Sequence, residues 1–449
     1  MPGLPCPERR ATVEMAVPVK VLSAGGGTGA HVTVPTRPHH SQVAIDRFAE
    51  RTSRRAAAPP PAFVALASVI ALLTVLGLVM VLSASSITAL RQSGSPWGYF
   101  EKQLIGAVVG LAILLVTLGV PYAWWRRVAP LGLLGAVVLL VAVLVPGVGI
   151  VVNGARAWIP VGPFAVEPSE VAKLAVLVYT ADLLTRRAHR MSDVRATLRP
   201  ALVAGGLAAL LVVAEHDLGP AIVIMVVALA VAFIAGTPIV PLGAAVSGLA
   251  AAAAIATMQA GYRRSRWTAF LDLAAHKSDS GFQVWQSLIG IASGGLTGEG
   301  LGAGRAKWGF LPEAHTDFIF AIIAEELGFV GVVTVCALFV LFGALGIHAA
   351  LHARDRFGTL LAGGVTAWIL VQATINIGGV IGIMPLTGLT LPFVSFGGSS
   401  LLITMAAAGL LLNVARHPAP ARVGRPTPTS LEAVDRAGDD ERHRAEGNE

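Results

Sequence analysis

The sequence predicts an all-α, polytopic membrane protein with about ten transmembrane helices, and its composition and its apolar runs both point to this fold class. Hydrophobic residues make up 55% of the 449 residues, charged residues only 13%, and the mean hydropathy is +0.72, well above the range of soluble proteins. Apolar runs long enough to cross about 30 Å of hydrocarbon occur at 62–84, 103–120, 128–146, 170–185, 200–215, 219–235, 238–258, 318–347, 358–383 and 399–415. Within 219–258 only Gly236-Thr237-Pro238 interrupts the pattern, which leaves the count open by one.

Arginine placement predicts the orientation of these helices. The connections before the first span and after the second, fourth and eighth spans are rich in arginine: Arg51, Arg54, Arg55, Arg126, Arg127, Arg186, Arg187, Arg190, Arg195, Arg199, Arg354 and Arg356. By the positive-inside rule, these connections and both termini are cytoplasmic. Segment 259–316 then forms one long extracellular loop, although it carries six cations, because long loops follow the rule poorly. A cationic outer loop favours an anionic ligand such as a lipid pyrophosphate.

The flanks differ in composition from the predicted membrane domain, 61–416. Residues 1–60 are rich in Pro, Ala, Arg and His without an apolar period, which predicts a disordered cytoplasmic arm. The arm lacks the apolar core of a cleavable signal peptide, so we expect the first span to be a retained anchor. Within it, Gly25–His31 resembles the glycine-rich loop of lipid-intermediate UDP-GlcNAc transferases, but no matching domain follows, so a chance or vestigial match is favoured. Residues 417–449 predict a disordered, solvated cytoplasmic tail.

The stretch Gly309–Phe320 carries the strongest signal of chemistry. It places Glu313, His315 and Asp317 immediately before an apolar helix. A carboxylate at the first turn of a helix is stabilised by the helix dipole and by free backbone N–H groups, whereas placing it deeper in lipid costs about 2.5–3.5 kcal/mol. Such a residue usually serves chemistry or transport. The alternative, left open by the spacing, is that Asp317 simply caps the helix with help from Thr316.

Polar residues also gather at the outer ends of the third to sixth spans. Glu170 and Lys173 are spaced i,i+3, so they can pair on one face of a helix start. A lysine inside a span needs such a partner or a polar ligand, and both interpretations remain open. Asp217 follows Glu215 and His216, and His216 lacks partners at zinc-ligand spacing, which favours an interfacial role.

The long outer loop and the last connection add three further expectations. Within 281–296, Phe282, Trp285, Ile289 and Ala292 fall on one stripe with Gln286 elsewhere, which predicts an amphipathic helix on the outer leaflet. The glycine-rich segment 294–304 predicts a flexible hinge. Segment 384–400 predicts non-helical backbone at membrane depth, which survives only when it is buried in protein or lines a wet cavity. We therefore expect it to border the cavity that Asp317 faces.

Taken in order, these motifs resemble the SEDS family of bacterial shape, elongation, division and sporulation proteins, the group of FtsW and RodA, over about residues 62–415. Six blocks carry the resemblance: Asn153 to Ile159; Pro168-Ser169-Glu170 with Lys173; Asp217-Leu218-Gly219; Gln286-Ser287-Leu288 with the glycine segment; Leu311 to Phe320 running into Glu325-Glu326-Leu327-Gly328; and Pro392 to Ser400. Two departures concern headgroup binding, since Glu215-His216 replaces the usual Gln-Pro and Ala157 replaces an Arg or Ser.

The resemblance implies a peptidoglycan glycosyltransferase that polymerises lipid II at the outer face of the plasma membrane. Asp317 occupies the position of the family's essential aspartate and is the expected general base. Arg156, Lys173 and Lys307 are candidates for neutralising the leaving pyrophosphate, and Glu313 and His315 for orienting Asp317 or the acceptor. The candidate binding set also includes Asp217, Gln286, Ser395 and Ser399, whereas Glu170 and Glu325 are expected to be paired structural groups.

Cofactor and partner expectations follow from the same resemblance. A divalent cation, magnesium or manganese, acting with Asp317 is left open, and no organic cofactor is expected. Besides lipid II, the expected partner is a class B penicillin-binding protein of the FtsI type, with FtsZ or the FtsQ, FtsL and FtsB proteins as candidate partners of the tails. No nucleic-acid partner is expected.

Within the family, the long polar tails, Ala314 and the short 186–199 connection favour the FtsW branch, which acts at the division septum. The high content of Ala, Val, Gly and Arg is typical of a high-GC actinobacterium. The alternatives are a RodA-type elongation polymerase, a lipid II flippase that uses Lys173 and Asp217 along a headgroup path, and a non-catalytic division scaffold.

Overall fold

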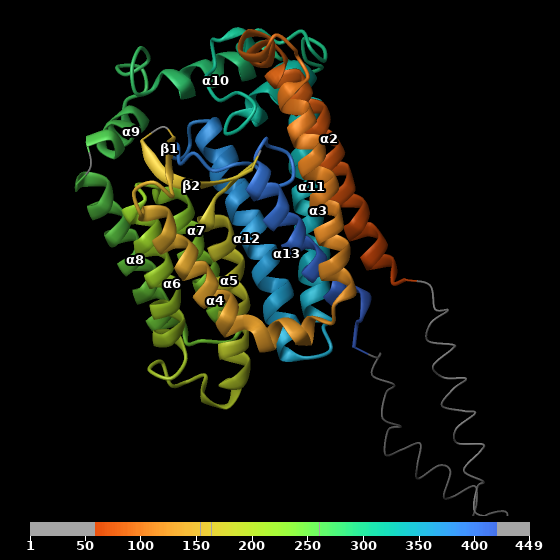
Figure 1. The fold of residues 1–449 in the computed structure, drawn as a ribbon, viewed down its shortest axis with the longest axis vertical. Helices are drawn as coiled ribbons and strands as arrows, with labels where there is room; N and C mark the ends of the chain where they lie inside the picture. Colours follow the sequence, from red (N-terminus) through yellow and green to blue (C-terminus); the bar gives the residue numbers. More distant parts are fainter. Residues whose placement is uncertain (1–58, 153, 163, 260, 420–449) are drawn as a thin grey trace, which may run out of the picture. The chain divides into compact units, whose positions relative to one another are not determined.

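The computed structural model describes residues 59–152, 154–162, 164–259 and 261–419, and its main body is a helical bundle (Figure 1). The bundle helices are α2 (Pro61–Ser93), α3 (Gly98–Gly119), α4 (Tyr122–Leu144), α5 (Pro168–Arg186), α6 (Leu198–Ala214), α7 (Leu218–Ile234), α8 (Ile239–Gln259), α11 (Ile319–Leu351), α12 (Arg356–Val380) and α13 (Gly398–Arg416). Each apolar run predicted from the sequence corresponds to one of these helices, although several runs extend past the helix ends. The predicted N-terminal arm with its Gly25–His31 loop, and the tail beyond Ala419, lie outside the described residues.

Among the described residues, seven helices are long and apolar enough to cross a membrane: α2, α3, α4, α8, α11, α12 and α13. Helices α6 and α7 are equally apolar but have only 17 residues each. Helix α5 is less apolar because it contains Glu170, Lys173 and Asp182, yet all three side chains are buried. Because α5 packs against α4, α7 and α12, its polar groups face protein rather than lipid. The chain is therefore a multi-pass membrane protein.

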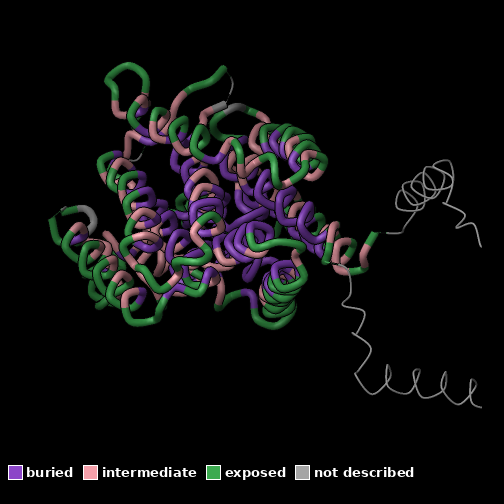
Figure 2. Tube along the Cα trace, turned by 90° about the horizontal axis from the view of Figure 1, so that it is seen from below, coloured by how far each residue is buried: buried purple, intermediate pink, exposed green. Residues whose placement is uncertain are grey.

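The buried core lies along the axis of the bundle, and the exposed side chains lie on its periphery (Figure 2). Helix α12 contacts α11, α7 and α5, and α13 packs along the length of α3. Helix α8 is the opposite case, since only Leu242 and Thr257 are buried among its side chains. Such an apolar but exposed helix is suited to lipid contact.

A small antiparallel sheet, which the sequence analysis did not predict, joins α4 to α5. Its strands are β1 (Ile150–Val152), β2 (Ala155–Val161) and β3 (Phe164–Val166), in the order β1-β2-β3. Ile150 pairs with Trp158 and Ile159 pairs with Val166, and such β-branched and aromatic residues favour strands. The all-α prediction therefore holds for the membrane-spanning part. Asn153, the first residue of a motif named above, lies outside the described residues.

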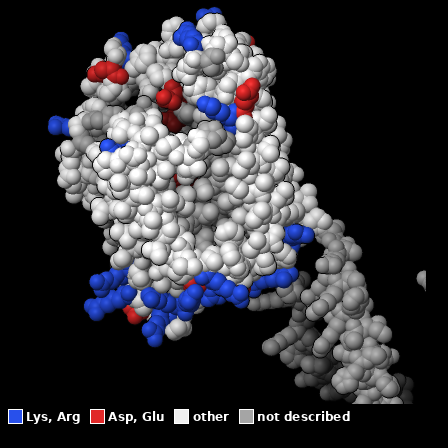
Figure 3. All heavy atoms as spheres, in the orientation of Figure 1, with Lys and Arg blue, Asp and Glu red and all other residues white. Residues whose placement is uncertain are grey.

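Cationic side chains gather in a band at one end of the helices (Figure 3). At the start of α4 and the end of α5, Asp182 forms ion pairs with Arg126 (2.7 Å) and Arg186 (2.8 Å). Near the opposite end, acidic and cationic side chains are visible together. The cationic band matches the arginine pattern on which the orientation rests, while the side that faces the cytoplasm stays a prediction.

Two short helices follow α8, α9 (Gly261–Leu271) and α10 (Phe282–Ser293). The amphipathic helix expected at 281–296 is therefore present as α10. Its predicted apolar stripe faces outward, since Ile289 is 48% exposed, while Ser287 and Gly290 on the other face are buried. Because α10 packs against α11, its inner face is fixed to the bundle.

The expectation of a flexible glycine hinge at 294–304 is wrong, because this segment, the glycine strap, is clamped to α11. The N–H groups of Glu299 and Gly300 donate to the carbonyl oxygens of Glu325 (3.0 Å) and Glu326 (3.1 Å). Directly after the strap, the Glu325 carboxylate accepts from the N–H groups of Arg305 (2.6 Å) and Ala306 (3.1 Å). Helix α11 is interrupted here by Gly328, at φ 65°.

Close approach, rather than flexibility, explains the glycines. A Cβ added at Gly294 would overlap the carbonyl oxygen of Ala324, and one at Gly298 would overlap that of Glu326. At Gly304 it would meet the Glu325 carboxylate at 2.8 Å. The strap therefore needs residues without a side chain where its backbone touches α11.

Replacing Gly298 by alanine should destabilise the protein more than replacing Gly302. Both glycines have φ +82°, so both substitutions carry the cost of a left-handed backbone, about 1–2 kcal/mol. Only Gly298→Ala adds the overlap with α11, since nothing lies within 4 Å of a Cβ at Gly302. Thermal unfolding of the purified variants in detergent measures the difference. Equal melting temperatures would contradict the close-approach explanation.

Candidate active site

A tight turn places Asp317 just before α11. Glu313 has φ 56°, and its carbonyl oxygen accepts from the N–H groups of Thr316 (3.2 Å) and Phe318 (3.4 Å). Helix α11 begins at Ile319, and its N-cap residue is Phe318, with no side-chain capping bond. The structure therefore does not support a role for Asp317 as the cap of α11, and its carboxylate is available for a different role.

The turn is held by Asn376 on α12 and by the connection between α12 and α13. The Asn376 side chain on α12 donates to the carbonyl oxygens of Asp317 (2.8 Å) and Leu389 (2.6 Å). The Phe396 N–H donates to the carbonyl oxygen of His315 (2.9 Å). A Cβ at Gly388, which has φ +74°, would lie 3.6 Å from Oδ2 of Asp317. The connection 381–397 is non-helical, as expected, and it lies against the Asp317 turn.

The electrostatic setting of Asp317 suits a proton acceptor near neutral pH. Burial, with a further contribution from the Glu313 charge, raises the pKa of Asp317 to about 7. Arg266 on α9 lowers it, and Asp217 raises it slightly. Because a general base works best with a pKa near the operating pH, this carboxylate is well matched to that role.

Asp217, at the start of α7, is the second carboxylate of the site. Burial raises its pKa to about 6, opposed by Lys173 and by the Gly219 N–H. Glu215, which stands at a position where the family motif usually has glutamine, is fully buried. Neither of its carboxylate oxygens has a hydrogen-bond partner among the described residues. Burial and the Asp217 charge raise the pKa of Glu215 to about 8. Glu215 is therefore mostly protonated at neutral pH, which reduces the cost of leaving it unpaired.

The ammonium group of Lys173 is paired with Glu170 and enclosed by protein, and it does not line an open pocket. Its Nζ is 2.8 Å from Glu170, donates to Oε1 of Gln372 (2.9 Å) and lies 5.4 Å from the centre of the Trp368 ring. The side chain is 0% exposed. In this arrangement Lys173 contributes positive charge near Asp217 without direct access to a phosphate.

Lys307 is engaged in an ion pair of its own. It forms an ion pair with Glu326 (2.8 Å) and donates to the Ser83 hydroxyl (3.2 Å), and it is buried beside the glycine strap. Glu325 binds backbone N–H groups, as described above, so both glutamates of α11 stabilise this segment. Lys307 as a phosphate ligand stays a prediction that needs this pair to open.

The other candidates take positions around the site. Arg156 on β2 donates through Nη1 to the Leu144 carbonyl oxygen (3.4 Å). His315 is buried between Tyr99 and Phe396, and burial lowers its pKa despite the opposing Glu313 charge.

The structure places the remaining three candidates as follows. Gln286 is half-buried on α10. The Ser395 hydroxyl accepts from the Leu391 N–H (2.8 Å), and the Ser399 hydroxyl accepts from the Glu167 N–H (3.3 Å).

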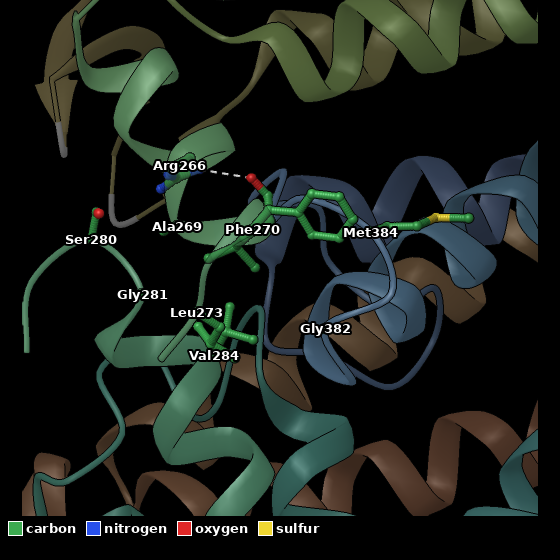
Figure 4. Close-up of a pocket in the computed structure, with 10 residues that line it drawn as sticks. Arg266, Ala269, Phe270, Leu273, Ser280, Gly281, Val284, Gly382 and Met384 are labelled. Atoms are coloured by element: carbon green, nitrogen blue, oxygen red, sulfur yellow. Dashed lines mark hydrogen bonds between the residues drawn. The ribbon is translucent and has the colours of Figure 1, made fainter. Parts of the chain in front are cut away.

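Arg266 is the functional candidate that the sequence reasoning did not single out. It lies on α9, donates to the Leu386 carbonyl oxygen (3.3 Å) and acts on the charge of both Asp317 and Asp217. Figure 4 shows it at one side of a small pocket, with Phe270 and Met384 among the lining residues. The only sequence signal was the run of three arginines at 263–266, which fixed no partner.

The described residues do not form a protein-only metal centre. Among them, no three His, Cys, Asp or Glu side chains are close enough to hold a metal ion. The residues present therefore do not fit a preformed magnesium or manganese site. The divalent cation stays a prediction.

Comparison with known proteins identifies relatives over most of the chain. A family model for FtsW, RodA and SpoVE, described as cell cycle protein, matches residues 64–419. The probable peptidoglycan glycosyltransferase FtsW of Thioalkalivibrio sulfidiphilus is 46% identical over 80% of this chain and 91% of that protein. The protein of the same name from Mycobacterium tuberculosis is 42% identical over 80% of this chain and 68% of its own length. A solved peptidoglycan synthase complex, studied for its coordination of polymerization and crosslinking, contains a chain with a TM-score of 0.65 at 30% identity, covering 78% of this chain and 96% of that one.

Proposed function

The chain belongs to the FtsW, RodA and SpoVE family, and we propose that it is the septal peptidoglycan glycosyltransferase that polymerises lipid II with Asp317 as general base. The enzyme class, peptidoglycan glycosyltransferase, follows from relatives that match most of the chain. The residue assignment rests on one observation. Asp317 is a desolvated carboxylate with a pKa of about 7, held beside an arginine and against an irregular membrane segment.

The reaction joins an acceptor sugar to the anomeric carbon of a lipid-linked donor. Asp317 takes the proton of the acceptor's 4-hydroxyl group as its oxygen forms the new glycosidic bond, and the bond from the anomeric carbon to the pyrophosphate breaks. The leaving undecaprenyl pyrophosphate carries away the electron pair. Positive charge must lie near this group, and Arg266 is best placed to supply it, because it already acts on Asp317.

The glycine at 388 keeps a side chain away from the carboxylate. A Cβ there would lie 3.6 Å from Oδ2 of Asp317, the oxygen that the acceptor's hydroxyl group must reach. Glu313, exposed and hydrogen-bonded to Thr316, raises the basicity of Asp317 and is available to orient the acceptor. The site thus combines a base with a cation that acts on its charge.

The flippase alternative has weaker support. A headgroup path through the bundle would need accessible charges, and Lys173 is fully enclosed by Glu170, Gln372 and Trp368. A scaffold without activity would not need a desolvated aspartate, which is costly to maintain. The choice between the septal role and a RodA-type role in elongation rests on the FtsW relatives.

Partners and location extend the proposal. The structural relative works within a synthase complex that couples polymerization to crosslinking, which supports a class B penicillin-binding protein of the FtsI type as partner. We place the enzyme in the plasma membrane at the septum, with both termini cytoplasmic and residues 259–316 outside. Binding of FtsZ or of FtsQ, FtsL and FtsB stays a prediction, because most of the tails lie outside the described residues.

Asp317→Asn should abolish polymerisation and preserve the fold. The amide keeps the size of the side chain, and the bond from Asn376 goes to the backbone oxygen, which the substitution leaves unchanged. Loss of a general base lowers the rate by about 10²–10⁴-fold. The assay is glycan formation from labelled lipid II by purified protein with its partner. Asp279→Asn, an exposed aspartate of the same loop, serves as the control and should keep the parent rate. Near-parent activity of Asp317→Asn would refute the assignment.

Orientation is tested by cysteine labelling in intact cells, in a background without the native cysteines. A cysteine at Ser278, in the long loop, should react with an impermeant thiol reagent added outside. A cysteine at Ser192, in the arginine-rich connection, should react only after lysis. Both serines are exposed, so access to the reagent depends on the side of the membrane. The reverse pattern would overturn the orientation and the assigned face of the active site.

A further inference from the structure

An open apolar groove lies between α6 and α8 at the cationic end of the bundle. Its volume is about 490 Å³, within the range of about 300–1,000 Å³ that is common for ligand pockets. Leu198 and Leu202 form one wall, from α6, and Ala244 and Ala245 form the other, from α8. The site lies at the opposite end of α6 from Glu215 and Asp217, so it is separate from the candidate active site.

The groove exists because α8 has side chains too small to fill it. Helices α6 and α8 both pack on α7, which lies between them in the chain. Helix α8 turns Leu242 toward the bundle and leaves Ala244 exposed. Two alanines cannot bridge to α6, and Pro241 adds no flexible side chain that could close the gap. In a membrane, such a gap is filled by an acyl chain rather than by water, because its walls are apolar.

One end of the groove is cationic. Arg199 lines it directly, and Val194, which also lines it, is followed by Arg195. Both arginines are exposed, and within the described residues neither forms an ion pair. The nearby acids are already engaged: Asp182 pairs with Arg126 and Arg186, and the Asp193 carboxylate accepts from the N–H groups of Arg195 and Ala196.

We propose that this groove binds an anionic phospholipid, with an acyl chain between α6 and α8 and the phosphate held by Arg199, beside the further positive charge of Arg195. Charge complementarity selects the occupant, because an apolar slot with arginines at its membrane-surface end matches a lipid with a negative headgroup. Phosphatidylcholine also offers a phosphate, but its quaternary ammonium group cancels that negative charge and is repelled by the arginines, so an anionic headgroup is favoured. The site gives the enzyme a fixed lipid contact beside the connection that leads into α6.

The test is native mass spectrometry of the full-length protein in mild detergent. Phosphatidylglycerol and phosphatidylcholine with identical acyl chains are added in turn, and the bound fraction is measured. The parent protein should retain phosphatidylglycerol preferentially. Arg199→Gln should weaken phosphatidylglycerol binding about fivefold, the effect of one arginine near a membrane surface, and weaken phosphatidylcholine binding less, so that the preference for phosphatidylglycerol falls. Ala245→Phe, which fills the groove, should weaken the binding of both lipids.

Arg416→Gln is the matched control, because it removes the same charge from an exposed position at the end of α13, which does not line the groove. It should bind phosphatidylglycerol like the parent. Melting without added lipid checks that each variant is folded. Equal retention of both lipids by the parent protein would mean that only general lipid contact occurs. An equal loss in Arg416→Gln and Arg199→Gln would mean that unspecific charge attraction explains the preference. Either result would overturn the proposal.

Discussion

The arrangement of the site depends on one side-chain amide, that of Asn376. It donates to the backbone of Asp317 and of Leu389, and so ties α12 to the turn before α11 and to the irregular connection before α13. The turn and the connection have no regular secondary structure at the point of contact, so their position depends on this amide together with the bond from the Phe396 N–H to the His315 carbonyl oxygen. Because Asn376 is itself buried, the cost of breaking these bonds is high. Asp317 is therefore presented by a fixed frame, which allows the bundle to keep a desolvated carboxylate in one position.

The charges around this frame oppose one another. Burial and the neighbouring acids Glu313 and Asp217 favour the protonated form of Asp317, while Arg266 favours the ionised form. A carboxylate with no cation nearby would be permanently protonated and could not accept a proton. One in a tight ion pair would be too weak a base. Arg266 on α9 is joined to the last connection through Leu386, so in the proposed mechanism segment 259–316 contributes a charge to the site.

Much of the fold could be predicted from the sequence, because length and apolarity alone specify membrane helices. The irregular segment after α12 was also predictable, since Pro and Gly at membrane depth have few permitted roles. The sheet before α5 was missed because its strands are short and lie between two long apolar runs. The glycine strap was misread, because glycine serves flexibility and close approach equally well, and only the contacts with Glu325 and Glu326 distinguish them. The sequence likewise identified Lys173 and Lys307 as candidates, but only the contacts show that each has a buried partner.

The central claim, that Asp317 is the base, is tested most directly by the pH dependence of kcat/KM for polymerisation. A base must be ionised in the free enzyme, so activity should fall as pH drops through its pKa. With that pKa raised to about 7, kcat/KM should be constant above pH 8 and fall about tenfold per pH unit below about pH 6. An acidic limb near pH 4, the ordinary range of an aspartate, or a flat profile between pH 5 and 8, would contradict it.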